Sequence, residues 1–136
     1  MPFSFTPTQA QYNECVVEDL DGDGSMTTYD SSEHAFKHSM SYQGAISDDY
    51  LFMPGIQMAA GTYRLSYEWM SKTDRENYSI VLSTGTASTT VAQTIVDRND
   101  VTSSNSWVTE TISFDVTEAG IYHLGIHVYS PNGRWN

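Results

Sequence analysis

The chain has 136 residues, a size typical of one domain with its own hydrophobic core. Seventeen acidic against six basic residues give a formal net charge of −11, which excludes nucleic acid and anionic membrane surfaces as natural partners and favours cations, calcium above all. The single Cys excludes an internal disulfide. No apolar run is long enough for membrane insertion and no signal peptide is present, so residues 1–136 are expected to be one domain from a larger secreted protein.

The predicted elements are mostly strands, because apolar and polar residues alternate with period two through most of the chain. One short helix is predicted first, from Thr6 to about Cys15, with Thr6 as N-cap and Pro7 in the first turn. The strands that follow are predicted at 35–39, 50–53, 63–69, 78–83, 91–96, 108–116 and 122–129. Short, regularly spaced strands with little helix predict an all-β fold, a jelly-roll β-sandwich.

An acidic segment from Asp19 to Asp30 matches the twelve-residue calcium loop. In that pattern Asp19, Asp21 and Asp23 hold positions 1, 3 and 5, and Asp30 closes the loop at position 12. Alternate carboxylates on a tight turn converge on one point, where a cation relieves their repulsion. A structural calcium ion is therefore predicted, with a solvated acidic turn as the alternative.

The remaining reactive residues do not form a catalytic set, so no enzyme activity is expected. His123 and His127 share one face of a strand but stand roughly 13 Å apart, too far to bind one metal ion. Cys15 lies beside two valines and is expected to be a small buried side chain.

A carbohydrate site is placed on the strand face that carries His123, Gly125, His127 and Tyr129. Gly125 is expected to leave a shallow groove between the two imidazoles, lined by polar groups. The alternative is that this face packs under a loop.

The order of several motifs resembles the cleaved adhesin domains of gingipains and the related choice-of-anchor modules of Bacteroidetes. The motifs are the acidic turn, the segment Asp48-Asp49-Tyr50-Leu51-Phe52-Met53-Pro54, the strand Gly61-Thr62-Tyr63-Arg64-Leu65-Ser66 and the strand from Gly120 to Ser130. This resemblance implies a galactose-binding-like jelly roll that is secreted or held at the cell surface. It further implies a non-catalytic, often calcium-containing module for adhesion or carbohydrate binding. The modules usually continue into one more strand, whereas three residues follow the turn at 131–133 here.

These observations lead to a function and one alternative. The chain is expected to be an extracellular, calcium-stabilised module that binds glycans or host-surface proteins, and the alternative is a structural spacer with no ligand except calcium. Because three residues cannot complete a strand, a strand beside that gap is expected to expose unpaired groups and to allow self-association through its edge.

Overall fold

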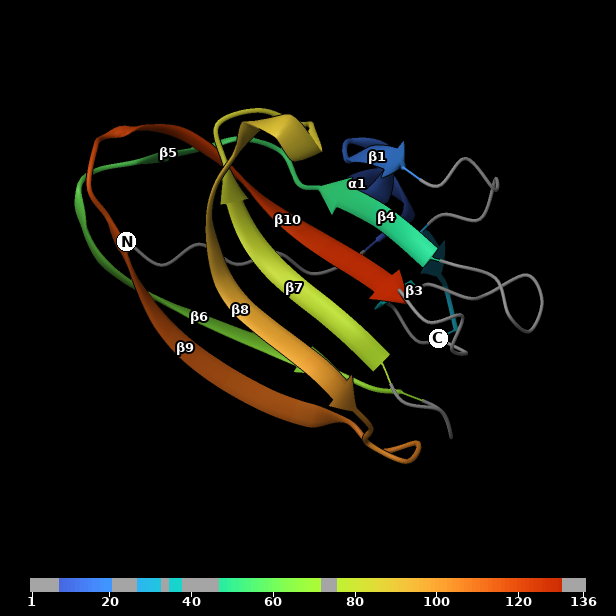
Figure 1. Cartoon of the computed structure of the whole chain (residues 1–136). Helices are drawn as coiled ribbons and strands as arrows, with labels where there is room; N and C mark the ends of the chain where they lie inside the picture. The colour runs from blue at the N-terminus through green and yellow to red at the C-terminus, as the bar shows by residue number, and fades with distance from the viewer. Residues whose placement is uncertain (1–7, 21–26, 33–34, 38–46, 72–75, 131–136) are drawn as a thin grey trace.

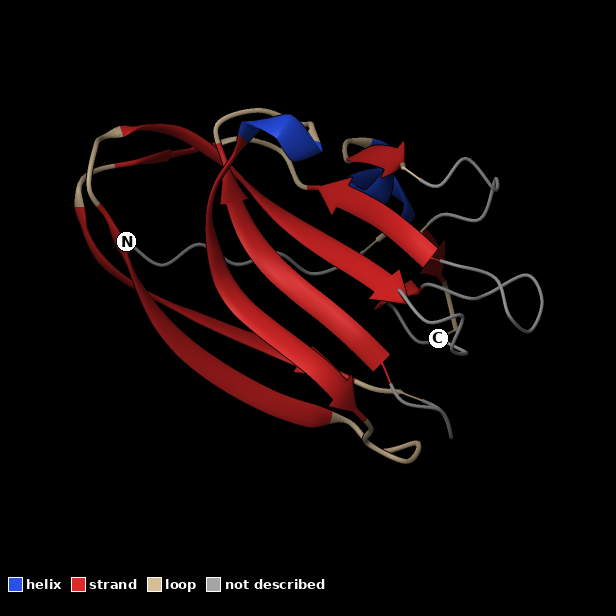
Figure 2. Ribbon diagram, in the orientation of Figure 1, coloured by secondary structure: helices blue, strands red, loops and turns tan. Residues whose placement is uncertain are grey.

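The computed structural model describes residues 8–20, 27–32, 35–37, 47–71 and 76–130, and these residues form an all-β domain with one short α-helix (Figures 1 and 2). All strand pairs among them are antiparallel. The elements are α1 (Gln9–Asn13), β1 (Val16–Asp19), β2 (Thr28–Asp30), β3 (Ala35–Lys37), β4 (Ser47–Phe52), β5 (Ile56–Met58), β6 (Gly61–Trp69), β7 (Glu76–Ser83), the 3-10 helix η1 (Ser88–Thr90), β8 (Val91–Val101), β9 (Val108–Val116) and β10 (Gly120–Ser130).

The strands form two layers, as expected for a jelly-roll sandwich. The larger sheet has the order β1-β4-β10-β7-β8, and β5 continues it beside the first residues of β10. Strands β6 and β9 form a second sheet, which Figure 1 shows below and to the left of β7 and β8. The β2–β3 hairpin forms a third pair and contacts α1 through a hydrogen bond from the Tyr12 hydroxyl to the Thr27 carbonyl. The predicted fold class is confirmed.

The core lies between the larger sheet and the β6–β9 pair. One apolar cluster gathers around Met58, Leu82 and Val116, and a second gathers around Tyr78, Ile80 and Val96. Every second residue of β6 and β9 is half-buried toward these clusters while its neighbours are exposed, which is the alternation seen in the sequence.

Strand β10 lies in the centre of the larger sheet. It pairs with β7 on one side, and on the other side it pairs with β4 and, along its first residues, with β5. The expected open edge is therefore not an edge of β10. Within the described residues, the strands with one neighbour are β1, β2, β3, β5, β6, β8 and β9, and self-association through an edge remains a prediction.

The helix is also present, but it begins later than predicted. Thr8, not Thr6, is the N-cap, because its hydroxyl accepts the Gln11 amide at 3.1 Å and thereby satisfies a free donor of the first turn. Thr6 lies outside the described residues. The short strands β1, β2 and β5 were not among the predicted strands, since three or four residues give too little alternation to recognise.

A polar cluster joins the two layers where the core meets solvent. The hydroxyls of Tyr67 on β6 and Tyr78 on β7 both donate to Oε2 of Glu110 on β9, each at 2.8 Å. Arg98 on β8 lies 3.5 Å from the other carboxylate oxygen. Burial acts to raise the pKa of Glu110, but the two phenol hydrogen bonds and the arginine charge outweigh it, and the pKa is lowered. Burial raises the pKa of Tyr67 to about 12.

This cluster predicts that the free energy of unfolding depends on pH. Because the pKa of Glu110 is lower in the folded chain, its contribution is complete above the unfolded pKa near 4.5 and is lost as pH falls through the folded value. Glu110→Gln should lower the free energy of unfolding by about 1 kcal/mol at pH 7. Thermal melts from pH 7 to pH 3 should show the two proteins converging in acid. A constant difference at every pH would contradict this assignment.

Candidate functional site

The outer face of the larger sheet is the one that points away from the β6–β9 pair. Leu124 packs into the core, so His123, Gly125, His127 and Tyr129, which alternate with it on β10, face outward. The sequence prediction that these four share one face is consistent with this arrangement. Cross-strand register adds outward-facing residues from the neighbouring strands, namely Glu18, Asp48, Tyr50, Phe52, Ser79, Val81, Ser83 and Asp97.

Four rings stack in a row across β4 and β10. Tyr50 lies parallel to Phe52 with ring centroids 5.3 Å apart, and parallel to His127 at 4.1 Å. His127 in turn stacks on Tyr129 at 4.7 Å. The inner rings of this row therefore have neighbours on their faces and present mainly edges and polar atoms outward.

Polar groups flank the end of the row formed by His127 and Tyr129. His127 Nε2 lies 2.6 Å from Oδ1 of Asp48, whose side chain is 44% exposed. The Tyr129 hydroxyl contacts Oδ1 of Asp97 at 2.7 Å and also contacts the side-chain amide of Asn99. We call these residues the outer-face cluster: Asp48, Tyr50, Asp97, Asn99, His127 and Tyr129.

Hydrogen bonding shapes the electrostatics of this cluster. The hydrogen bond from Tyr129, together with those from Ser79 and Asn99, holds the pKa of Asp97 below its usual range. Burial first, and then the hydrogen bond to Asp97, raises the pKa of Tyr129 to about 12. At neutral pH the phenol is therefore a hydroxyl that donates to a carboxylate anion.

The other half of the outer face is covered. The Phe52 ring and the Val81 side chain occupy the space above Gly125, where an added Cβ would meet them at 2.9 and 2.8 Å. Phe52 is fully buried. The groove expected at Gly125 is therefore absent, because a ring from the neighbouring strand fills the space that the glycine leaves.

The segment that connects β7 to β8 also covers part of the outer face, because it contacts β1. It includes η1, where the backbone amide and hydroxyl of Ser88 donate to the Glu18 carboxylate at 3.0 and 2.9 Å. At its base, the hydroxyls of Ser83 and Thr90 lie 2.7 Å apart. Ser83 is fully buried. The interpretation that this face packs under a loop therefore applies to one half of the face.

The structure brings together two of the three residues predicted for a carbohydrate site. His127 and Tyr129 belong to the outer-face cluster, whereas the His123 ring lies against the chain between β4 and β5, with Nδ1 2.7 Å from the Met53 carbonyl oxygen. Sequence reasoning missed Tyr50 and Asp97 as partners because they are far from β10 in the chain. Asp48 and Asp49 are adjacent on β4 and therefore point to opposite sides of the sheet, and Asp49 is fully buried.

The predicted calcium loop is described only at its two ends. Asp21 and Asp23 lie outside the described residues, while Asp19 ends β1 and Asp30 ends β2. Asp30 Oδ1 accepts the amide and hydroxyl of Ser32 at 2.9 and 2.7 Å. Among the described residues, no group of three or more His, Cys, Asp or Glu is placed to hold a metal ion.

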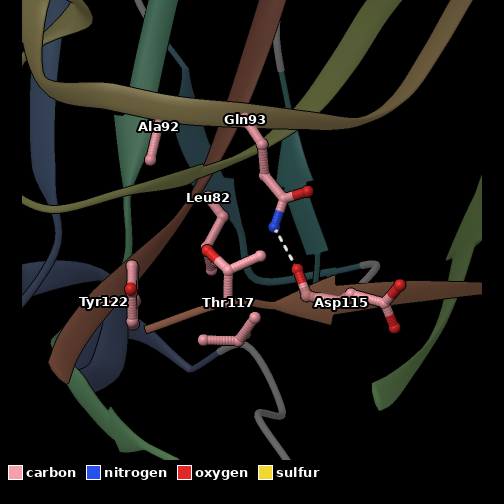
Figure 3. A pocket seen from close by; sticks show the side chains of 7 residues that line it. Leu82, Ala92, Gln93, Asp115, Thr117 and Tyr122 are labelled. Atoms are coloured by element: carbon pink, nitrogen blue, oxygen red, sulfur yellow. Dashed lines mark hydrogen bonds between the residues drawn. The ribbon is translucent and has the colours of Figure 1, made fainter. Parts of the chain in front are cut away.

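A pocket of about 270 Å³ opens between the layers near the beginnings of β8 and β10 (Figure 3). Gln93 crosses it and donates to the Asp115 carbonyl at 2.8 Å. The Asp115 carboxylate instead accepts the hydroxyl of Thr62 on β6 at 2.6 Å. The lining therefore offers no acid and base pair, and it consists of Leu82, Ala92, Gln93, Asp115, Val116, Thr117 and Tyr122.

Solved structures share this architecture, although no protein-family model and no curated protein matches the sequence. The K2 cleaved adhesin domain of Lys-gingipain aligns with 98% of this chain and 93% of its own, at 16% identity and a TM-score of 0.68. The K1 domain of Lys-gingipain from Porphyromonas gingivalis aligns with 90% of this chain and 84% of its own, at 14% identity and a TM-score of 0.67. The fold is that of a cleaved adhesin domain. The resemblance inferred from the order of the sequence motifs is thereby confirmed.

Carbohydrate-binding modules have a related fold. The family 6 module of a laminarinase from Zobellia galactanivorans aligns with 89% of this chain and 92% of its own, at 20% identity and a TM-score of 0.50. A family 35 module from Clostridium thermocellum aligns with 91% and 86% at 8% identity, again with a TM-score of 0.50. The cleaved adhesin fold of this chain thus belongs to a wider group of jelly rolls.

The contact above Gly125 gives a stability prediction. Gly125→Ala would place a methyl group against the Phe52 ring and Val81, and such overpacking typically costs about 1–3 kcal/mol. Gly120→Ala is the matched control, because its Cβ would meet only the Tyr122 ring, at an ordinary 3.7 Å. Urea denaturation should show a lower midpoint for Gly125→Ala alone. Equal midpoints for both variants would mean that the sheet accommodates the methyl group.

Proposed function

We propose that this chain is a non-catalytic, extracellular or cell-surface module that binds carbohydrate through the outer-face cluster. The observation that carries the proposal is the juxtaposition of ring edges, carboxylates and an amide on an exposed part of a rigid sheet. The cleaved adhesin fold and its likeness to carbohydrate-binding modules support the same class of function. No helix among the described residues is long and apolar enough to cross a membrane.

The chemistry of the cluster favours a neutral sugar. Carboxylates such as Asp48 and Asp97 accept hydrogen bonds, and sugar hydroxyls can donate them while the C–H groups of a pyranose make apolar contact with an aromatic ring. Among the described Lys and Arg residues, none lies in the cluster. Lys37 is 3.9 Å from Asp30, and Arg98 is directed to Glu110 between the layers. As far as the described residues go, an anionic glycan would therefore meet negative charge with no lysine or arginine beside it.

A binding panel tests this function. Soluble laminarin, xylan, mannan and galactan represent neutral glycans, while polygalacturonate and heparin represent anionic ones. Calorimetry should detect a neutral glycan, and Tyr129→Ala should weaken its binding about tenfold, as expected for a central aromatic contact. His123→Ala is the control, because that ring lies outside the cluster. If no glycan of the panel binds, the spacer function is favoured. If Tyr129→Ala binds as well as the unmodified chain, the outer-face cluster is not the binding site.

We further propose a structural calcium ion held by the acidic segment, with Asp19, Asp21, Asp23 and Asp30 as its candidate ligands. Carboxylate oxygens are the donors that calcium prefers. The register supports the proposal, because it places a further acidic residue, the buried Asp49 on β4, directly opposite Asp19. The ion would thereby join β1 and β4 to the segment that leads to β2.

Calcium should raise the stability of the domain. Binding to the folded state alone contributes about 2.7 kcal/mol at a hundredfold excess over the dissociation constant. For a domain of this size, this corresponds to several degrees of melting temperature. Thermal melts with calcium and then with chelator should differ, and the Asp21→Ala, Asp23→Ala double variant should abolish the difference. Identical melts of the unmodified chain would exclude a stabilising ion.

A further inference from the structure

The loop between β8 and β9 carries the most exposed indole that the structure describes. Trp107 retains 45% of its surface in contact with solvent, and its neighbours Ser104, Asn105 and Ser106 are exposed as well. Trp69, by contrast, packs into the core between the two layers. The segment 102–107 has the sequence Thr-Ser-Ser-Asn-Ser-Trp, which contains no charged residue in a chain of net charge −11.

This loop is held in one conformation. Its turn is closed by the Ser106 amide, which donates to the Ser103 carbonyl at 3.1 Å. Ser71, which is 3% exposed, anchors the turn from the end of β6. Its hydroxyl accepts the Ser103 amide at 2.8 Å, its carbonyl accepts the Asn105 amide at 2.9 Å, and its own amide donates to the Ser103 hydroxyl at 2.8 Å.

The turn also maintains an unfavourable backbone conformation. Ser104 and Asn105 have φ angles of 50° and 66°, in the left-handed region where glycine is normally favoured. A pair of glycines would form the same turn without that steric cost. Conformational strain of this kind is concentrated at binding and catalytic sites, where a rigid surface reduces the ordering cost of binding.

The surroundings of Trp107 favour a sugar over a protein. The core of a protein interface needs several neighbouring apolar side chains. Among the described residues, the other large exposed apolar side chains are Val16, Leu20 and Ile121, which belong to β1, its following residue and the start of β10. Trp107 instead follows three exposed residues with small, uncharged polar side chains, Ser104, Asn105 and Ser106. An exposed flat apolar ring together with such hydrogen-bonding groups suits one face and the edge hydroxyls of a pyranose.

We propose that Trp107 and the turn at 103–106 form a second carbohydrate contact, in which one neutral pyranose ring stacks on the indole and hydrogen-bonds to the polar side chains beside it. This contact is separate from the outer-face cluster, and it rests on the proposed function only in that the ligand is a carbohydrate. A chain of sugars could engage both places or either one.

Calorimetry with the full chain and the four neutral glycans named above tests this contact. Trp107→Ala should weaken binding about tenfold or more. Ile121→Ala is the matched control, since Ile121 is 59% exposed and should be replaceable without effect on binding. The Ser104→Gly, Asn105→Gly double variant should fold with an unchanged or higher melting temperature and should bind several-fold more weakly, because the turn loses its rigidity while Trp107 remains.

The outcomes separate the two proposals. If the unmodified chain binds a glycan and Trp107→Ala binds it equally well, this inference is overturned and the proposed function stands. If Trp107→Ala loses binding while Tyr129→Ala does not, the inference stands and the outer-face cluster is the wrong site. Failure of the unmodified chain to bind any glycan overturns the proposed function and this contact together. Binding to intact mucin and to deglycosylated mucin can also be compared. If Trp107→Ala weakens both equally, the indole contacts protein and the sugar assignment is overturned.

Discussion

The alternation of side chains along β10 is the constraint on which the rest of the structure depends. This strand has hydrogen-bonded neighbours on both edges, so its register is fixed from both sides. Leu124 then points into the core, while His127 and Tyr129 point outward beside Tyr50. A slip by one residue would exchange the core face of β10 for its outer face. The stability of the sandwich and the geometry of the outer-face cluster therefore come from one pairing.

The local pattern of the sequence was sufficient to predict the longer strands and the fold class. The sequences of β6, β7, β9 and β10 alternate apolar and polar residues over most of their length, which is the pattern of a strand. The opposite orientations of Asp48 and Asp49 also follow from period two alone. The acidic segment remains a calcium prediction, because its central residues lie outside the described part of the chain.

The composition of the candidate site could not be predicted in the same way, because it depends on which strands become neighbours. Tyr50 meets His127, and Asp97 meets Tyr129, only through long-range pairing. Gly125 shows the difficulty most clearly. A glycine in a strand indicates missing volume, but the sequence does not tell which neighbour fills it, and here the Phe52 ring does so. The rigid turn before Trp107 was likewise hidden, since serine is not a residue that marks positive φ.

Hydroxyl groups hold many of the carboxylates of this acidic chain in place. Tyr129 donates to Asp97, Tyr67 and Tyr78 donate to Glu110, and Ser88 donates to Glu18. Each contact joins two elements that are distant in sequence. For Asp97 and Glu110, the hydrogen bonds also help to lower the pKa of the carboxyl group. Arg98 also lies beside Glu110, at 3.5 Å, so a cation supports the two tyrosines there. Among the described residues, the outer-face cluster is rich in hydrogen-bond acceptors and contains no lysine or arginine. Those properties suit a neutral, hydroxyl-rich ligand better than an anionic ligand, which the negative charge of the surface would repel.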